Sequence, residues 1–299
     1  MKLFGRKEKA TGEILAGGEN AIANKEVEGL SQGQIVRRRF FRHRAAVIAL
    51  VTLSSIILFV LTSLDSKIGP IRIPGWWKWT VEDIPELRFE DCPGGTTGCP
   101  TLSLNPTGDF GMGNHPFGQD DIGRDYFALV MNGARRSLMI MFVIGAVSGF
   151  IGVVVGSISG FYGKRVDAVL MRLVDFIQTV PTIIIAAVIG KAAGRVGPLF
   201  LALFLGILGW TGLARLVRAQ FLSLREMEFV DAARVAGASN IRIAFKHILP
   251  NAVGQIIVSV TLIMAGAILT ETALSYLGFG VVAPDVSLGL LISQYESSF

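Results

Sequence analysis

The sequence predicts an all-α integral membrane protein with five membrane-spanning helices. Of its 299 residues, 51% are hydrophobic and 17% are charged, and the mean hydropathy is +0.55, which is too apolar for an ordinary soluble domain. Five apolar segments are long enough to cross a bilayer, since a helix needs about 20 apolar residues to do so. A cluster of arginines directly precedes the first segment, as is typical of the cytoplasmic end of a span.

The N-terminal region divides into a polar tail and a basic anchor. Residues 1–36 mix Lys, Glu, Gly and Asn without a sustained apolar period, which predicts a disordered cytoplasmic tail. Residues 37–44 contain five arginines, and the apolar run 45–64 follows at once. Positive charges beside a span are retained in the cytoplasm. We therefore expect a basic anchor and first transmembrane helix over 37–64, with the N-terminus inside.

A long polar stretch separates the first span from the rest of the chain. Residues 65–131 are rich in Pro, Gly, Trp, Asp and Asn, too polar to lie in lipid, and are expected to form an external loop with an insert. Three tryptophans close to the span are expected at the level of the lipid headgroups, with a ligand-stacking platform as the alternative. They are Trp76, Trp77 and Trp79.

The two cysteines of the chain lie in this loop. Cys92 and Cys99 enclose six residues rich in Gly and Thr, a composition typical of turns. The predicted topology puts them on the oxidising side of the membrane, so a disulfide is the expected state and a pair of free thiols the alternative.

Four further apolar segments are expected to span the membrane: residues 138–160, 172–192, 198–217 and 252–280. The first contains a row of glycines spaced three or four residues apart, which places them on one helical face. In lipid, helices associate by close backbone approach over small residues, so this row is predicted to be a packing surface. Its members are Gly145, Gly149, Gly152, Gly156 and Gly160.

Loop charges support this topology. The predicted inner loop 161–171 contains Lys164 and Arg165, and the predicted inner loop 218–250 contains Arg218, Arg225, Arg234, Arg242 and Lys246, as cytoplasmic loops do. Basic residues that fall on the predicted external side are exceptions, among them Arg135, Arg136, Lys191 and Arg195. The net charge of +5 is therefore attributed to cytoplasmic loops and not to nucleic-acid binding.

Signatures of catalysis and of metal binding are missing from the sequence. No segment reads Gly-x-x-x-x-Gly-Lys-Ser/Thr, so the chain is not expected to hydrolyse ATP. The three histidines lie in different loops, and none belongs to a helical metal-binding pair. His115 with Asp120 and Asp121 is explained as a solvated loop before a helix, with a cation site as the alternative. We predict neither a catalytic residue nor a metal site.

The inner loop 218–250 carries the most specific pattern. Residues 226–236 favour a helix, Gly237 permits a left-handed break, and Ser239 or Asn240 can cap a second short helix that Pro250 would end. An amphipathic pair lying on the membrane surface is one interpretation. Small residues beside oriented charges favour instead a docking surface for a partner. That surface contains Asp231, Ala232, Ala233, Arg234 and Gly237.

Two acidic residues lie inside predicted spans, where charge is costly and frequently functional. Arg172 and Asp175 are three residues apart and are expected to pair locally. Glu271 lies deeper, and a role in a cavity or gate and a structural pairing both stay open. An ion-coupled secondary transporter would need such groups, so Asp175 and Glu271 are the candidate pathway residues.

The inner loop resembles the coupling motif of ABC importer permeases. It reads Asp231-Ala232-Ala233, three residues, Gly237 and then Leu249-Pro250, with Asp231 where the family has Glu and with His247 in a His-Ile-Leu-Pro-Asn run typical of the peptide branch. Four further matches resemble the second permease subunit of the dipeptide/oligopeptide/nickel branch. They are His115-Pro116-Phe117-Gly118-Gln119-Asp120, Gly123-Arg124-Asp125, Gly160-Phe161-Tyr162-Gly163, and Leu274-Ser275-Tyr276-Leu277-Gly278-Phe279-Gly280.

The resemblance covers about 37–299 and implies a type I ABC importer transmembrane domain over 132–299. It implies a bacterial inner membrane permease for peptides, with nickel as the alternative substrate. The implied partners are a second permease subunit in a heterodimer, two cytoplasmic ATPase subunits that bind Mg-ATP, an external binding protein and membrane lipid. The chain itself would be non-catalytic and would hold no cofactor.

Within the loop 218–250 the resemblance assigns ATPase coupling to Asp231, Ala232, Ala233, Arg234, Gly237, His247, Leu249 and Pro250. Family members carry a sixth span after the segment that matches 284–299, so we expect the functional molecule to need one more crossing.

Overall fold

The computed structural model of the protein describes residues 38, 40–68, 71–87, 98–102, 113–193 and 197–296. The predicted tail 1–36 lies outside these residues, as do Cys92 and Arg195. The chain divides into two compact units, Met1–Leu58 and Phe59–Phe299. Nearly all regular structure is helical, so the all-α prediction is confirmed.

The first predicted span is the helix α3 (Arg44–Ser63). Two strands of three residues each follow it, β1 (Ser66–Ile68) and β2 (Ile71–Ile73), paired antiparallel with Ser66 opposite Ile73. This small hairpin is a local addition that the sequence analysis did not include.

The second span, α4 (Tyr126–Tyr162), is 37 residues long and exceeds the predicted 138–160 at both ends. The predicted external loop, 65–131, is therefore too long at its C-terminal end. The helix begins at Tyr126 because the Asp125 carboxylate caps it by accepting a hydrogen bond from the Ala128 N–H. Arg135 and Arg136, in its first turns, bond to neighbouring segments.

Each of the next two predicted spans is a bent pair of helices. The first is broken near Pro181 and bends by 66°, because proline lacks an N–H and disfavours helix in the residue before it. The second bends by 40° at Trp210. The pairs are α5 (Lys164–Gln178) with α6 (Thr182–Ala193), and α7 (Pro198–Gly209) with α8 (Thr211–Leu224).

The described residues thus contain three helices of spanning length, or five spans if each bent pair counts as one. The predicted inner loop 161–171 is also too long, because α5 begins at Lys164, directly after Gly163, which has a φ of +60°.

The predicted inner loop 218–250 folds into short helices before the last long one begins. The short ones are α9 (Glu228–Val235), α10 (Asn240–Arg242) and the π-helical segment η2 (Ile243–Ile248). The long one is α11 (Leu249–Tyr276). Pro250 was expected to end a helix and instead lies in the first turn of α11. The wider turn of η2 precedes it, and a first-turn proline has no N–H to lose from the helix. A last helix, α12 (Leu288–Tyr295), follows a turn.

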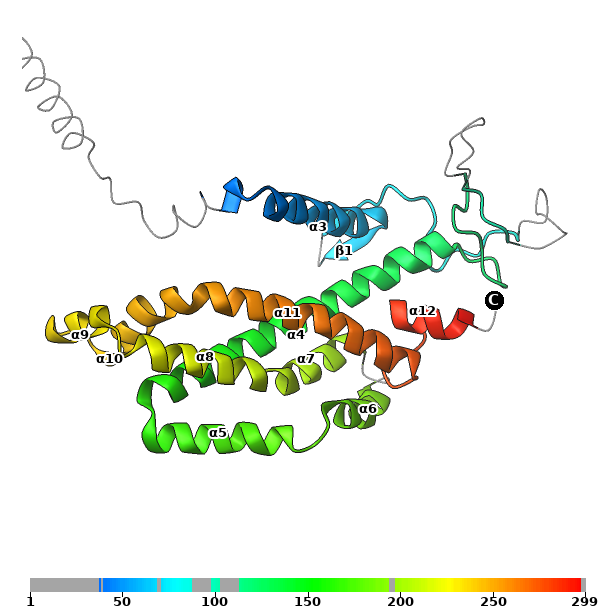
Figure 1. Ribbon diagram of the computed structural model, residues 1–299. Helices are drawn as coiled ribbons and strands as arrows, with labels where there is room; N and C mark the ends of the chain where they lie inside the picture. Colours follow the sequence, from blue (N-terminus) through cyan, green and yellow to red (C-terminus); the bar gives the residue numbers. More distant parts are fainter. Residues whose placement is uncertain are drawn as a thin grey trace, which may run out of the picture. The chain divides into compact units, whose positions relative to one another are not determined.

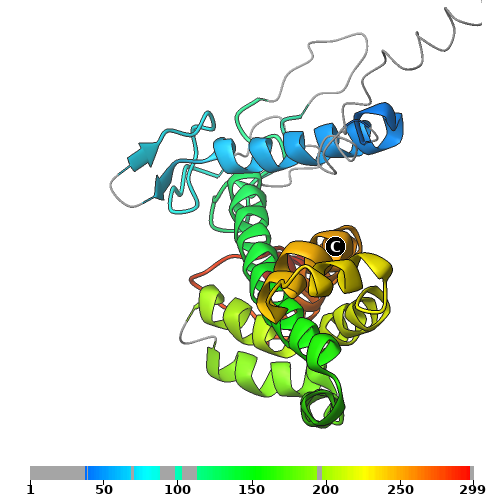
Figure 2. The same ribbon diagram turned by 90° about the vertical axis from the view of Figure 1, so that its left-hand side faces the viewer.

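Helix α4 is the centre of the second unit and packs most extensively on α8, α7 and α11, as Figures 1 and 2 show. The glycine row forms this contact, so the predicted packing surface is confirmed. A Cβ atom on Gly156 would lie 2.6 Å from the Ala214 backbone oxygen, and one on Gly160 would lie 2.6 Å from Phe221 Cβ. Because α8 approaches so closely, these positions have no room for a larger side chain.

Within this unit, polar segments gather at opposite ends of the bundle. Helices α9 and α10 lie at the end where α4 turns into α5, whereas residues 113–125 and α12 lie at the other end (Figure 1). The two predicted inner loops therefore share one end.

Candidate functional site

Helix α9 is held on the bundle by one buried face. Val230 is fully buried in an apolar cluster with Val217 and Phe221 of α8, Ile243 of η2 and Ile256 of α11. Burying such a side chain contributes about 1.5–3 kcal/mol. The exposed ion pair between Asp231 and Arg234 on the same helix contributes at most about 1 kcal/mol. Apolar anchoring therefore positions α9.

A sharp turn connects α9 to α10. Gly237 has a φ of +80°, and the N–H groups of Gly237 and Ala238 donate to the oxygens of Arg234 and Ala233, both at 3.0 Å. These bonds end α9 in the manner expected of a left-handed glycine. The Ser239 hydroxyl then accepts from the Arg242 N–H and begins α10. The predicted helix, break and cap are confirmed.

The outer face of this loop is exposed and mixes apolar with charged side chains. Val235 is 90% exposed and Ile241 67% exposed. Beside them, Arg234 Nη1 donates to Asp231 Oδ1 at 2.7 Å, with both side chains mostly exposed. Apolar side chains so fully exposed at a helical turn are suited to a protein contact.

The predicted coupling residues separate into two groups. Asp231, Ala232, Arg234 and Gly237 lie on the exposed face, whereas Ala233, His247 and Leu249 are half-buried behind it. The His247 backbone oxygen accepts from Asn251 Nδ2 at 2.7 Å. Pro250 is exposed at the start of α11.

Two arginine contacts that the sequence analysis missed hold the base of the loop. Arg225 Nη1 donates to the Gly160 backbone oxygen at 3.1 Å, which ties the end of α8 to the end of α4. Arg218 forms a two-point contact with Asp167, with Nη2 and Oδ2 2.6 Å apart, and the Ser159 hydroxyl donates to the same carboxylate at 2.5 Å. The sequence signal for this contact was an arginine and an aspartate in the two predicted inner loops, since a guanidinium and a carboxylate can form two parallel hydrogen bonds.

The two candidate pathway residues have different surroundings. Glu271 is fully buried and accepts hydrogen bonds from the Ser137 hydroxyl at 2.9 Å and from the Ser275 hydroxyl at 2.7 Å. Asp175 does not pair with Arg172 as expected. It pairs with Arg215 Nη2 of α8 at 2.5 Å, because α5 and α8 are neighbours in space.

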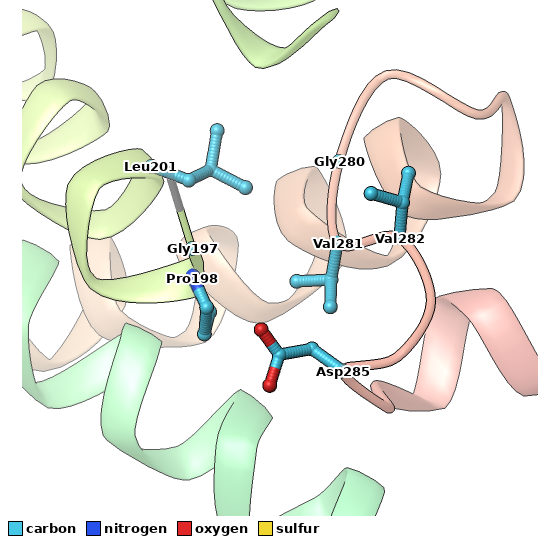
Figure 3. A pocket seen from close by; sticks show the side chains of 7 residues that line it. All are labelled: Gly197, Pro198, Leu201, Gly280, Val281, Val282 and Asp285. Atoms are coloured by element: carbon cyan, nitrogen blue, oxygen red, sulfur yellow. The ribbon is translucent and has the colours of Figure 1, made fainter. Parts of the chain in front are cut away.

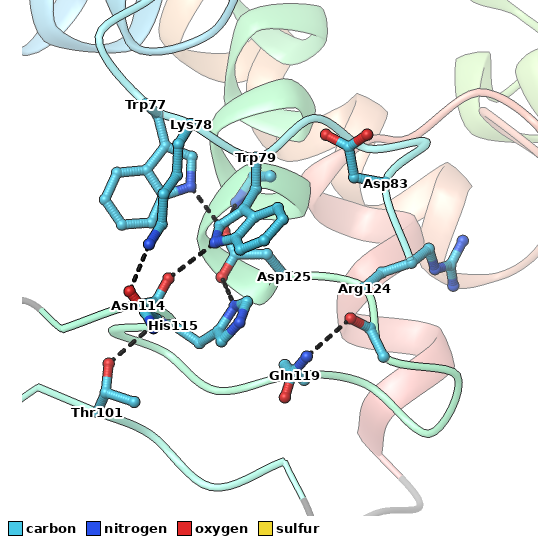
Figure 4. Close-up of polar contacts among 12 residues, drawn as sticks. Trp77, Lys78, Trp79, Asp83, Thr101, Asn114, His115, Gln119, Arg124 and Asp125 are labelled. Atoms are coloured by element: carbon cyan, nitrogen blue, oxygen red, sulfur yellow. Dashed lines mark hydrogen bonds and ion pairs between the residues drawn. The ribbon is translucent and has the colours of Figure 1, made fainter. Parts of the chain in front are cut away.

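At the opposite end of the bundle, Asp125 organises Trp77, Trp79 and His115 of the predicted external loop (Figure 4). Its Oδ2 accepts from Trp77 Nε1 at 2.8 Å and its Oδ1 lies 3.0 Å from His115 Nδ1. The Trp79 ring stacks on the His115 ring with centroids 5.3 Å apart. A polar residue directly before an apolar helix was the available signal for this cap.

These contacts correct the interpretation of the external residues. His115 and Asp120 are buried, not solvated, and His115 bonds to Asp125 and not to Asp120 or Asp121. Within the described ranges, no group of three His, Cys, Asp or Glu residues is placed to hold a metal ion. Trp77 and Trp79 donate hydrogen bonds within the protein, the latter from Nε1 to the Asn114 oxygen at 3.0 Å.

The helix α12 is attached to the turn that precedes α4. Asp120 accepts from Arg124 Nε at 2.7 Å and from the Tyr295 hydroxyl at 3.2 Å. Burial, together with the nearby charge of Asp120, raises the pKa of Tyr295 to about 12. Tyr295 also meets the ring of Tyr126 edge to face, with centroids 4.9 Å apart.

Arg135 and Arg136, two exceptions to the charge rule, have structural partners. Arg135 Nη2 donates to the backbone oxygens of Leu61 at 2.9 Å and Leu64 at 2.7 Å, at the C-terminal end of α3. Arg136 Nη2 lies 2.9 Å from Asp285 Oδ1. The Asp285 carboxylate points toward Pro198 across a cavity of about 10 Å³, room for roughly one water (Figure 3).

Fold and site together define a multi-pass membrane protein with an exposed helical loop at one end. Residues 152–298 match the family model of the binding-protein-dependent transport system inner membrane component. Residues 31–65 match the N-terminal TM domain of oligopeptide transport permease C.

Relatives of known name agree with these matches. The oligopeptide transport system permease protein OppC of Escherichia coli (strain K12) is 35% identical over 94% of this chain and 84% of its own length. OppC of Bacillus subtilis (strain 168) is 42% identical over 60% of this chain and 59% of its own length. The chain therefore belongs to the family of inner membrane components of binding-protein-dependent transport systems.

Among solved structures, an inward-facing form of the MetNI methionine ABC transporter matches with a TM-score of 0.45 and 21% identity. That match covers 56% of this chain and 81% of the other.

Proposed function

We propose that this chain is a permease subunit of an ATP-driven peptide importer and forms half of its translocation pathway. The observation that carries the proposal is the 35% identity to an oligopeptide permease over most of both chains. The relatives named for oligopeptide transport favour peptides over nickel as the substrate.

The charges at one end of the bundle support the topology proposed here. The end that holds α9 also holds Arg218, Arg225, Arg234 and Arg242, and such a surplus is typical of the cytoplasmic side. The chain lies in the bacterial inner membrane with its N-terminus in the cytoplasm. A second permease subunit completes the pathway, two cytoplasmic ATPase subunits bind Mg-ATP, and an external binding protein delivers the peptide. This chain catalyses no reaction and holds no cofactor.

The α9–α10 loop couples the permease to the ATPase subunits. Its anchor is apolar, its outer face is exposed, and its direction is set by one left-handed glycine, so it can transmit movement as a rigid unit. The eight coupling residues act in different ways. Asp231, Ala232, Arg234 and Gly237 contact the ATPase, the half-buried Ala233, His247 and Leu249 hold the loop on the bundle, and the exposed Pro250 lies in the first turn of α11.

The candidate pathway residues support ATP-driven over ion-coupled transport. Glu271 is enclosed by two serine hydroxyls, and Asp175 is paired with Arg215. Glu271 is thus enclosed, whereas a coupling-ion site needs groups that a passing ion can reach. Asp175 is exposed, but its charge is already balanced by Arg215.

Gly237 provides the sharpest test of coupling. No atom of this chain lies within 4 Å of a Cβ built there, so within the permease a substitution acts through the backbone and not through a clash. Valine strongly disfavours a positive φ, whereas Asn tolerates it. In the reconstituted importer we expect Gly237→Val to abolish peptide-stimulated ATP hydrolysis and uptake, and Gly237→Asn to retain most of both.

Two controls complete this test. Gly254→Val lies on the exposed side of α11, also with no atom within 4 Å, and should leave coupling intact. Asp231→Lys should weaken ATPase binding in a salt-sensitive way, because it reverses an exposed charge. If Gly237→Val inserts normally, keeps its ATPase partners and transports at the unmodified rate, the loop is not the coupling element.

A further inference from the structure

Two adjoining cavities lie between residues 80–82, the first turns of α4 and the turn that leads into α12. Their volumes are about 330 Å³ and about 600 Å³, within the range of roughly 300–1,000 Å³ typical of small-molecule sites. Both are lined by Val81, Glu82, Asn132 and Arg136. We call this combined space the external cavity.

Charges of both signs face the external cavity. Arg136 and Asp285 line the smaller part, and Arg135 lines the larger part. Arg136 spends one amino group on Asp285, and a guanidinium has five N–H donors, so it can serve a second acceptor. Glu82 is exposed.

Several of these groups lack partners in the part of the chain that the structure describes. The Nε of Arg135 is buried there without a hydrogen-bond partner, although buried polar atoms are nearly always bonded. Glu82 has no ion pair and Asn132 no side-chain hydrogen bond among these residues. Positive, negative and neutral polar groups that lack partners around one cavity are typical of a ligand site.

We propose that the external cavity binds a short peptide through both of its charged ends. The Glu82 carboxylate accepts from the terminal ammonium group, Arg136 donates to the terminal carboxylate, and Asn132 bonds the peptide backbone between them. A zwitterionic peptide carries a cation, an anion and neutral backbone amides, and these groups match Glu82, Arg136 and Asn132 in turn. The inference rests on the proposed function, and it adds a substrate site in the permease itself at the end opposite the coupling loop.

Glu82→Gln is the central variant, because Glu82 is exposed and forms no ion pair with any residue that the structure describes, so its replacement should not disturb folding. The permease is assembled with its partner subunits in lipid nanodiscs, without the binding protein. Binding of radiolabelled trialanine, N-acetyl-trialanine and trialanine amide is then measured. We expect Glu82→Gln to weaken trialanine binding about 10-fold, the effect of about 1.4 kcal/mol, and to leave N-acetyl-trialanine unchanged.

Arg136 tests the other end of the peptide. Arg136→Gln should weaken trialanine binding about 10-fold and leave trialanine amide unchanged. Because this change also removes the pair with Asp285, Arg136→Lys is the second variant and should retain most of the affinity. Glu86→Gln is the matched control, since Glu86 is exposed in the same segment and does not line the external cavity.

Three outcomes would overturn the inference. One is equal binding of trialanine to the unmodified and Glu82→Gln proteins. Another is a loss that is the same for free and blocked peptides. The third is no binding of any peptide while Glu82→Gln weakens docking of the binding protein, which would make this surface a protein contact. None of these results bears on ATP dependence, so failure of the proposed importer function is recognised separately, by uptake that needs no ATP.

Discussion

The Nη2 atom of Arg135 lies 2.7 Å from the backbone oxygen of Leu64. This contact joins α4 to the end of α3, whose last turn contains no basic residue of its own. The last carbonyls of a helix lack partners within the helix and carry partial negative charge. Arg135 therefore supplies from a neighbouring helix the cation that the end of α3 needs, which is a structural reason for an arginine on the predicted external side, where the charge rule does not expect one.

Replacing Arg135 should destabilise the junction between α3 and α4. We expect Arg135→Met to lower the stability of the detergent-solubilised protein by about 1–3 kcal/mol, because it leaves carbonyl groups unbonded. Arg135→Lys should cost less, since an ammonium can still reach one carbonyl. Thermal unfolding followed by circular dichroism measures both. Arg172→Met is the control at an exposed arginine, and equal losses for Arg135→Met and Arg172→Met would contradict the role of Arg135.

Alanine substitutions at helical glycines should distinguish packed positions, such as Gly156 in the glycine row of α4, from open ones, such as Gly254 in α11. A Cβ at Gly156 would lie 2.6 Å from the Ala214 oxygen and 2.7 Å from Val217 Cβ, so we expect Gly156→Ala to cost about 1–3 kcal/mol. Gly254→Ala meets no atom within 4 Å and should be neutral or slightly stabilising, because alanine favours helix. Thermal unfolding of the two variants provides the comparison. A Gly156→Ala protein as stable as Gly254→Ala would show that α8 does not approach α4 so closely.

The phenol of Tyr295 should make stability depend on alkaline pH. Its pKa of about 12 in the folded protein exceeds the ordinary value of about 10, so the folded state keeps the proton that the unfolded chain loses first. The resulting stabilisation is complete below about pH 10 and is lost as the pH rises through about 12. Tyr295→Phe should remove this part of the pH profile, and Tyr162→Phe should retain it. Ultraviolet titration of tyrosinate in the three proteins checks the assignment.

The predicted disulfide between Cys92 and Cys99 stays a prediction, since Cys92 lies outside the described residues. Gly98, which directly precedes Cys99, is bonded to the segment before α4, because its oxygen accepts from the Gln119 N–H at 2.8 Å. We expect mass spectrometry of protein alkylated in intact cells to find both cysteines bridged. Two alkylated thiols would refute the pairing.

The sequence by itself determined the architecture wherever the physical signal is local. Apolar runs of spanning length predict helices because no other open structure satisfies the backbone in lipid. The spacing of the glycine row predicted the face on which α4 packs, and Gly237 predicted the turn after α9, since only glycine takes a left-handed conformation readily. The turn between α9 and α10 was predictable because its signals, a glycine and a capping serine, are local in sequence.

Tertiary structure alone decided the partners of the charged residues. Asp175 was expected to pair with Arg172 on its own helix, but α8 brings Arg215 within reach. His115 lies near Asp120 and Asp121 in sequence and yet bonds to Asp125. Helix periodicity constrains contacts three or four residues apart, whereas an ion pair forms with whichever opposite charge the packing places within about 4 Å. The external cavity has the same origin, because its walls come from segments about 50 and 150 residues apart that only the packed bundle brings together.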